Sequence, residues 1–234
     1  MTRVAMWSGP RNISTAMLRS FGARSDTVVV DEPMYAYYLA RTGLQHPGRD
    51  EVLAAQPTEW ADVVAGLLAP LPPGVTVQYV KHMTHHLLTR PDEEWFDACR
   101  HAYLIRDPAK VVASYAQVRD EPTLADLGFA QQVAIWREHP GPVVDADALL
   151  ADPRGALAAL CEALEIPFQE SMLSWAPGPR DTDGVWAKYW YAGVESSTGF
   201  AAPRTGATVV PERLRHLIDE ARPYYEELAA QRLV

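Results

Sequence analysis

Two short runs in this chain place an arginine at the turn between an expected strand and an expected helix, where a phosphate group could bind. In the first, apolar residues 4–7 predict a strand, Ser8-Gly9-Pro10 breaks it, and an amphipathic segment covers residues 13–22. Such a junction directs several backbone N–H groups and the positive end of a helix dipole to one place. Arg11 adds a fixed positive charge. The run predicts an anion-binding loop, although an ordinary strand-to-helix turn would have the same residues.

Ser14 and Thr15 distinguish the sequence of this loop from that of the common nucleotide-binding phosphate loop. Their hydroxyls lie where the first helical turn has unused N–H groups, but a phosphate loop would have Gly-Lys at these positions after Gly9. The lysine that would reach the terminal phosphates of ATP or GTP is missing from the pattern. This absence argues against a protein that hydrolyses nucleoside triphosphates.

The second arginine-bearing turn lies later in the chain. Residues 101–105 predict a strand, and Asp107 is expected to cap the helix that Pro108 begins. Arg106 would then stand at the strand end, with Ser114 about two turns into the helix. Each run thus places an arginine just beyond the carboxyl end of a strand.

Taken together, the two runs resemble the sulfotransferase family. Pro10-Arg11-Asn12-Ile13-Ser14-Thr15 is similar to that family's loop around the 5′-phosphosulfate of 3′-phosphoadenosine 5′-phosphosulfate (PAPS), usually Pro-Lys-Ser-Gly-Thr-Thr. Arg106 and Ser114, with seven residues between them, are similar to its 3′-phosphate site. Residues 145–153 and 196–200 also resemble segments of the family.

The resemblance implies a fold, a donor and a set of donor-binding residues. The fold would be a three-layer α/β/α domain with a central mostly parallel sheet, similar to P-loop nucleoside triphosphate hydrolases, and the strand–helix alternation up to residue 165 agrees with this. The donor would be PAPS, with no metal. The implied donor-binding residues are Pro10, Arg11, Asn12, Ile13, Ser14, Thr15, Arg106 and Ser114, with Lys188 and Arg204 as second contacts to the 3′-phosphate.

Glu32 is the candidate general base. Residues 27–30 predict a buried parallel strand that ends at Asp31-Glu32-Pro33. Because ligands bind outside the carboxyl ends of the strands in such sheets, Glu32 should lie on the same edge as Arg11. It also resembles the Glu-Pro base of sulfotransferases that act on heparan sulfate, which takes the proton of the acceptor hydroxyl. A strand-end cap for the next helix is the alternative.

Lys81 should reach this edge at the end of the strand predicted for residues 75–81. It would neutralise the oxygens of the transferring sulfuryl group or hold Glu32 ionised. Many sulfotransferases have Lys-x-His here, with the histidine as base, but Met83 occupies that position in this chain and favours Glu32. The predicted catalytic residues are therefore Arg11, Glu32 and Lys81, with Arg11 in place of the family's lysine.

Aromatic and histidine side chains are the candidate acceptor contacts. Residues 175–181 and 186–191 hold several large side chains outside a regular helix, which predicts either a surface for a flat acceptor or a packed lid. The histidines after Lys81 lack an acidic partner close in sequence, so acceptor contacts or caps are favoured over a metal site. The predicted acceptor residues are Tyr35, His82, His85, His86, Trp186 and Trp190.

Length, charge and composition restrict the remaining possibilities. A chain of 234 residues without a low-complexity linker predicts one domain, residues 1–234, with a lid segment at about 170–210. A net charge of −9 with no dense basic run argues against nucleic-acid and membrane partners. The lack of a signal sequence and of an apolar run of about 20 residues predicts a soluble, cytoplasmic protein. Cys99 and Cys161 are expected to be buried and reduced.

Four further segments give expectations about the fold. Residues 42–58 should form a loop, and residues 60–68 a helix. Residues 124–137 predict one long amphipathic helix, and residues 211–231 predict a helix that is interrupted near Pro223.

The predicted function is that of a PAPS-dependent sulfotransferase that acts on a hydroxyl or amine of a small molecule. The aromatic segment and the acidic net charge favour a small or flat acceptor over a long anionic polysaccharide. Two alternatives stay open: a phosphotransferase with an unusual phosphate loop, and a nonenzymatic nucleotide-binding protein that has kept the fold. The sequence leaves the oligomeric state open.

Overall fold

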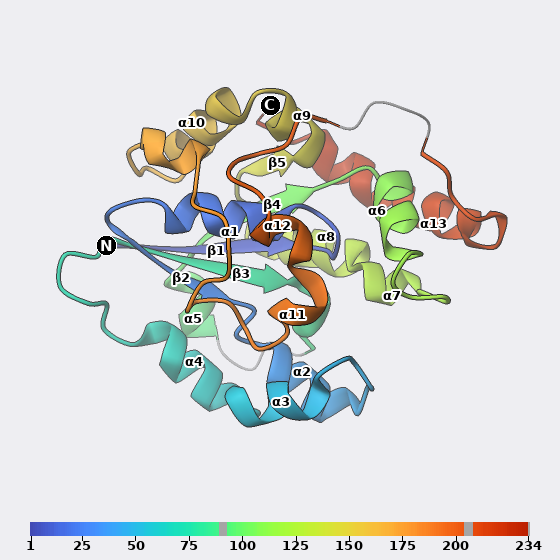
Figure 1. Cartoon of the computed structure of the whole chain (residues 1–234), viewed down its shortest axis with the longest axis horizontal. Coiled ribbons are helices and arrows are strands. Elements are labelled where there is room, and N and C mark those ends of the chain that lie inside the picture. The colour runs from blue at the N-terminus through green and yellow to red at the C-terminus, as the bar shows by residue number, and fades with distance from the viewer. Residues whose placement is uncertain (89–92, 204–207, 234) are drawn as a thin grey trace.

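Five parallel strands form the central sheet of the computed structural model, which describes residues 1–88, 93–203 and 208–233 (Figure 1). The strands are β1 (Thr2–Ser8), β2 (Thr27–Asp31), β3 (Val77–Met83), β4 (Arg100–Ile105) and β5 (Val143–Asp145). Their order in the sheet is β2-β3-β1-β4-β5, so the first strand of the chain lies in the middle. The expected α/β fold with a mostly parallel sheet is confirmed.

Helices cover both faces of this sheet (Figure 1). On one face lie α1 (Ser14–Gly22), α9 (Ala146–Ala151) and α10 (Pro153–Ala163). On the other lie α4 (Trp60–Leu68), α5 (Glu93–Asp97), α8 (Phe129–Glu138) and α13 (Arg215–Ala229). Among the described residues, no helix is both long enough and apolar enough to cross a membrane.

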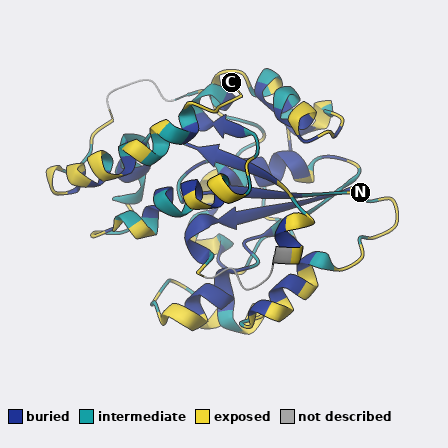
Figure 2. Cartoon of the chain, turned by 180° about the vertical axis from the view of Figure 1, so that it is seen from behind, coloured by how far each residue is buried: buried dark blue, intermediate teal, exposed yellow. Residues whose placement is uncertain are grey.

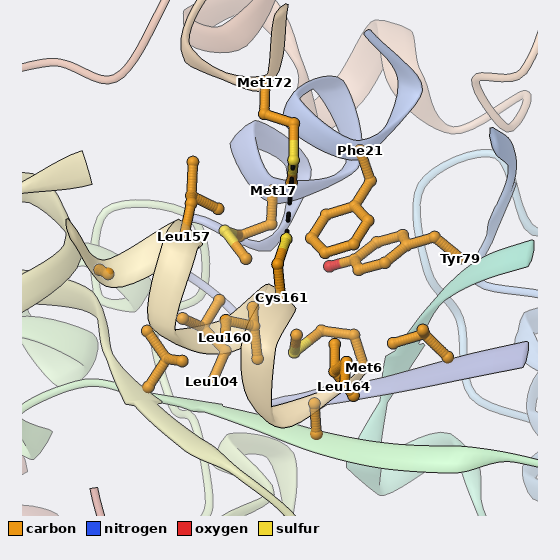
Figure 3. Packing of buried hydrophobic residues seen from close by; sticks show 14 of the residues in the cluster. Met6, Met17, Phe21, Tyr79, Leu104, Leu157, Leu160, Cys161, Leu164 and Met172 are labelled. Atoms are coloured by element: carbon orange, nitrogen blue, oxygen red, sulfur yellow. Dashed lines mark hydrogen bonds between the residues drawn. The ribbon is translucent and has the colours of Figure 1, made fainter. Parts of the chain in front are cut away.

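Side chains alternate along the strands between two hydrophobic cores, as the period of two in a strand requires. Met6 faces α1 and α10 in the first core, whereas Trp7 faces α4 and α8 in the second core. Figure 2 shows that the strands are largely buried, and Figure 3 shows the first core, where the sulfur of Cys161 lies 3.8 Å from that of Met172. Cys161 is buried as expected, while Cys99 is only partly buried.

The remaining elements are short, and several gather where the strands end. These elements are α2 (Tyr35–Thr42), α3 (Arg49–Ala55), α6 (Pro108–Tyr115), α7 (Leu124–Leu127), α11 (Ala187–Trp190), α12 (Ala192–Glu195) and the 3₁₀ turns η1 (Thr84–His86), η2 (Glu170–Leu173) and η3 (Glu212–Leu214). The helices α11 and α12, drawn in orange, belong to the lid segment and lie near the end of β3 (Figure 1).

The single long helix expected over residues 124–137 is wrong. Gly128, with a φ of 75°, ends α7 and precedes α8. The carbonyl of Gly128 accepts a hydrogen bond of 2.9 Å from the Thr84 hydroxyl, and a Cβ atom on Gly128 would lie 2.3 Å from that oxygen. Close packing against η1 therefore requires a glycine here, and the helix breaks at it.

Two other expectations need correction. The segment 42–58 is not all loop, because α3 forms within it and buries Val52. Pro223 lies inside α13 without interrupting it. A proline removes one helical hydrogen bond, but the buried side chains of Leu217, Ala221 and Leu228 hold α13 on the protein. The helix at residues 60–68 is confirmed as α4.

β3 runs two residues beyond its expected end, and this decides the surroundings of His82. Because successive residues of a strand face opposite sides of the sheet, Lys81 and His82 point in different directions. The His82 ring is buried and stacks on Trp7, with 4.5 Å between ring centres. This burial lowers the pKa of His82 to about 3.

Replacing His82 by phenylalanine is expected to remove an acid-sensitive part of the stability. The folded imidazole stays neutral while the unfolded one gains a proton below its ordinary pKa of 6.5, so stability is lost as the pH falls from there toward 3. Between about pH 7 and about pH 5 the loss is about 2 kcal/mol. Urea unfolding at both pH values should show a smaller pH-dependent loss in His82→Phe, with the exposed His216→Gln as the control. Equal losses in His82→Phe and wild type would contradict a neutral buried ring.

Candidate functional site

The loop between β1 and α1 is held by distant parts of the chain. Gly9 is required because a Cβ atom there would lie 2.4 Å from the carbonyl oxygen of Leu127. The side-chain amide of Asn12 donates a hydrogen bond of 2.5 Å to the carbonyl of Leu104, near the end of β4. α1 begins at Ser14, directly after this loop. Tertiary contacts therefore set the conformation of the expected anion-binding loop.

The structure brings the two arginine-bearing turns together at the carboxyl edge of the sheet. Arg106 donates a hydrogen bond of 2.7 Å to the backbone carbonyl of Arg11. The Arg11 guanidinium donates through Nε to the hydroxyl of Ser114 at 2.9 Å. Asp107 caps α6 by accepting from the N–H of Ala109, as the sequence predicts. Two guanidinium groups and a hydroxyl are thus gathered at one place.

A cavity of about 790 Å³ extends from these arginines to the ends of β2 and β3. It is lined by residues from all three predicted groups, those for the donor, for catalysis and for the acceptor. The predicted residues that line it are Pro10, Arg11, Asn12, Ile13, Ser14, Thr15, Glu32, Tyr35, Lys81, His85, His86, Arg106, Ser114 and Trp190.

Lys81 is buried, and its ammonium has an acceptor for each of its three N–H groups. The donated bonds go to Glu32 Oε1 at 2.7 Å, Asp31 Oδ1 at 2.9 Å and the hydroxyl of Tyr191 at 2.6 Å. Burial alone would lower the pKa of Lys81, but the two carboxylates hold it well above its ordinary value. Of the two expected roles, this geometry supports holding Glu32 rather than contacting the sulfuryl oxygens.

Glu32 lies in the left-handed backbone region, with a φ of 40°, directly after β2. Its N–H donates to the carbonyl of Lys81 at 3.0 Å, and its own carbonyl accepts from the N–H of Tyr35 at 3.1 Å, which leads the chain into α2. Burial raises the pKa of Glu32 by more than the positive charge of Lys81 lowers it. A carboxyl group with a raised pKa at a cavity wall is suited to accept a proton.

Two histidines of η1 form a neutral wall of the cavity. The His86 ring is stacked between Tyr35 and Tyr38, at 4.7 and 4.8 Å between ring centres. Burial lowers the pKa of His85 to about 4 and that of His86 well below its ordinary value, so both rings are neutral at neutral pH. No group of three or more His, Cys, Asp or Glu side chains within the described ranges could hold a metal ion.

Three predicted site residues lie away from the cavity. His82 is on the other face of the sheet, because it follows Lys81 in the same strand. Trp186 is buried beside Tyr35 and Tyr38, so it packs the lid. Lys188 is exposed and forms a surface ion pair. Arg204, the other expected 3′-phosphate contact, is outside the described residues.

The aromatic segment is thus mainly a packed lid rather than an open surface. Within it, Trp190 and Tyr191 line the cavity, while Trp175 and Trp186 are buried. Asp183 attaches the lid to α1 through a buried ion pair with Arg19.

Sequence reasoning did not assign Asp31, Tyr191 or Gln132 to the site. The buried amide of Gln132 donates to the carbonyls of Trp7 and Leu104, each at 2.9 Å, and so holds β1 and β4 together beneath the loop. A polar residue on the apolar side of a helix could have indicated Gln132. No local pattern indicates Tyr191, because its partners are distant in sequence.

The comparison with protein families matches residues 2–232 to the family described as "Sulfotransferase domain". The chain belongs to this sulfotransferase family. Two Arabidopsis thaliana relatives are "Branched-chain-amino-acid aminotransferase-like protein 1", 38% identical over 95% of this chain, and the corresponding protein 2, 34% identical over 97%. The matches cover 40% and 41% of those proteins, so this family member spans about two fifths of their length.

Solved sulfotransferase domains share the fold of this family member. The domain of the Synechococcus PCC 7002 olefin synthase matches with a TM-score of 0.53 and 16% identity, over 98% of this chain and 94% of that one. The domain from the curacin biosynthetic pathway matches with a TM-score of 0.51 and 14% identity, over 98% and 96%. The sulfotransferase from Alicyclobacillus acidocaldarius gives 0.51 and 13%, over 100% and 97%.

Replacing Lys81 by methionine is expected to destabilise the fold, more strongly at high pH. Without the ammonium, the pKa of Glu32 rises further, because burial and the neighbouring charge of Asp31 then act on it unopposed. A carboxyl group whose pKa is raised in the folded state contributes stability that is lost as the pH rises. Removing one partner of a buried ion pair costs about 3–5 kcal/mol. Urea unfolding should therefore show a larger deficit at about pH 8 than at about pH 5.

The matched control for this prediction is Lys110→Met. Lys110 pairs with Asp147 at 2.8 Å, and both side chains are about one third exposed, so its loss should cost no more than about 1 kcal/mol. Equal deficits for Lys81→Met at the two pH values would mean that Lys81 does not compensate the carboxylates.

Proposed function

We propose that this protein transfers a sulfuryl group from PAPS to a hydroxyl or amine of a small molecule. The observation that carries the proposal is the meeting of Arg11 with Arg106 and Ser114 at a cavity that Glu32 also lines. The family match over residues 2–232 supports the same reaction class. The two phosphate positions of the donor correspond to the two arginine-bearing turns.

The residues present fit a nucleotide of this kind. The loop before α1 offers backbone N–H groups and a helix N-terminus to the 5′-phosphosulfate, with Arg11 as the neighbouring cation. Arg106 and Ser114 would hold the 3′-phosphate, because a guanidinium presents planar, forked donors that match phosphate oxygens. A nucleotide without the 3′-phosphate would lose that second contact.

The roles of the chain's own groups follow from this placement. Bound PAPS would supply an activated sulfuryl group, whose bond to the 5′-phosphate breaks as the acceptor atom bonds to sulfur. Glu32 takes the proton that the acceptor loses, and its raised pKa favours this uptake. Arg11 stabilises the charge on the departing phosphate without giving up a proton. Lys81 holds the Glu32 carboxylate in position.

The other walls of the cavity indicate the chemistry of the acceptor. Tyr35, Trp190, His85 and His86 contribute rings to the lining, and both histidines are neutral. An anionic acceptor at this wall would contact uncharged rings and a carboxylate, so its negative charge would have no positive partner there. It favours a small, flat alcohol, phenol or amine.

Adenosine 3′,5′-bisphosphate is expected to raise the melting temperature of the protein, and ATP with magnesium to raise it less. A ligand at about 100 times its Kd adds about 2.7 kcal/mol to stability. Arg106→Ala should weaken bisphosphate binding roughly tenfold to hundredfold and abolish the preference for the bisphosphate over adenosine 5′-monophosphate. Arg154→Ala, at an exposed ion pair, is the control. A stronger response to ATP with magnesium would instead support a phosphotransferase.

Glu32→Gln is expected to remove most sulfuryl transfer while leaving bisphosphate binding unchanged. Losing a general base lowers the rate by about 10²–10⁴-fold. The release of adenosine 3′,5′-bisphosphate from PAPS would be followed with a panel of small alcohols, phenols and amines. The control is Glu51→Gln, because Glu51 forms an exposed pair with Lys188. Unchanged turnover in Glu32→Gln would remove the base assignment, and no turnover with any acceptor would favour a binding protein.

A further inference from the structure

Asp31 and Glu32 form a buried carboxylate pair that shares one ammonium. Lys81 Nζ lies 2.9 Å from Asp31 Oδ1 and 2.7 Å from Glu32 Oε1. With both carboxylates ionised, the three groups carry one net negative charge, which favours the uptake of a proton by the pair. Glu32 lines the cavity, so the site has a usable base only if that proton goes to Glu32.

The proton of the Tyr191 hydroxyl has one acceptor among its neighbours in the described structure. Its oxygen lies 2.6 Å from Lys81 Nζ and 3.1 Å from the indole nitrogen of Trp186, and both of these groups can only donate. The third neighbour is Asp31 Oδ2, at 2.6 Å. Tyr191 must therefore donate to Asp31, which also accepts from the N–H of Gly184 at 3.3 Å.

The two carboxylates differ in the donors that stabilise their ionised forms. Asp31 accepts from Lys81, Tyr191 and a backbone N–H. Glu32 accepts from Lys81 through Oε1, while Oε2 lies 4.0 Å from His86 Nδ1, beyond hydrogen-bond distance. Donors to the charged form of a carboxyl group favour its ionised state, so Asp31 is the better-stabilised anion.

We propose that Tyr191 is a positioning residue whose hydroxyl keeps Asp31 an anion and thereby directs the acceptor's proton to Glu32. The inference rests on the proposed function, because it concerns the base of the same reaction. One proton leaves the acceptor O–H or N–H and joins a Glu32 oxygen. Tyr191 keeps its own proton, and Asp31 stays deprotonated.

The other titratable groups around the pair leave this assignment intact. Burial raises the pKa of Tyr35 and of Tyr191, which keeps both phenols neutral, and it lowers the pKa of His86. The charge in this part of the described structure therefore comes from Lys81 and the two carboxylates. The facing groups are Lys81 from β3, His85 and His86 from η1, Tyr35 from α2, and Tyr191 from the lid.

Tyr191→Phe should keep the lid in place, because the lid has another attachment. Arg19 in α1 forms two hydrogen bonds with Asp183, and the two side chains are only 3% and 4% exposed. Phenylalanine also keeps the ring that packs beside Trp186 and Tyr35.

The test is a carbon-13 NMR titration of the whole chain with labelled aspartate and glutamate carboxyl groups, from about pH 5 to about pH 9. Asp31→Asn and Glu32→Gln assign the two signals. In wild type, the Glu32 signal should titrate while the Asp31 signal stays constant. In Tyr191→Phe, the Asp31 signal should begin to titrate, and the Glu32 signal should lose amplitude by a matching amount. Tyr189→Phe, at an exposed tyrosine of the same segment, should match wild type.

Identical titrations in Tyr191→Phe and wild type would overturn the inference. A second comparison applies if Tyr191→Phe folds poorly. In Asp31→Asn, the Glu32 signal should titrate at lower pH, because the neighbouring negative charge is gone, and Tyr191→Phe added to Asp31→Asn should move it no further. A further shift in the double variant would mean that Tyr191 acts on Glu32 by another route.

The titration contains neither donor nor acceptor, so its result is separate from that of the transfer assay. Lack of sulfuryl transfer with the expected titration would overturn the proposed function but leave the proton assignment standing. If the protein transfers the sulfuryl group but Tyr191→Phe titrates as wild type does, only the assignment of Tyr191 is overturned.

Discussion

The buried ammonium of Lys81 is the contact on which this site depends. Removing a charged lysine from water costs several kcal/mol, and that cost is offset because each N–H group has an oxygen acceptor within 2.9 Å. Those acceptors come from the end of β2 and from the lid, 110 positions away from Lys81 in the sequence. One buried charge therefore fixes the carboxylate at the cavity wall and also attaches the lid over the strand ends (Figure 1).

The charge distribution separates the cavity into two chemically different ends. Although the chain carries a net charge of −9, Arg11 and Arg106 lie together at one end, joined through a backbone carbonyl. Two arginines on neighbouring turns make that end suitable for an anion with several negative charges. At the other end, the only described cation, Lys81, is already shared by Asp31 and Glu32. In the proposed reaction, this difference in charge would direct the donor to one end of the cavity and the acceptor to the other.

The local sequence predicts the features of the site that depend on residues close together in the chain. Asp107-Pro108 specifies a helix start, and Glu32 and Lys81 were expected at one edge because each lies at the carboxyl end of an expected parallel strand. The structure adds that these two strands are neighbours in the sheet. Tertiary contacts decide the rest. Because β3 extends two residues beyond its expected end, His82 lies in the hydrophobic core and not in a loop. The hydroxyl of Tyr191 contacts Lys81 from a segment that has no regular apolar period. The secondary-structure propensities of individual residues do not encode such contacts.

Ile13 shows how far its surroundings determine the loop before α1. A β-branched residue with a φ of 52° is strained by roughly 1–3 kcal/mol, and the related run in the family usually has glycine there. The strain persists because Ile13 packs against the first core and its carbonyl accepts from the N–H of Met17 at 3.1 Å. Gly9 and Asn12 are held by contacts on either side. A loop fixed in this way has its N–H groups aimed in advance, so binding an anion need not include the cost of ordering them.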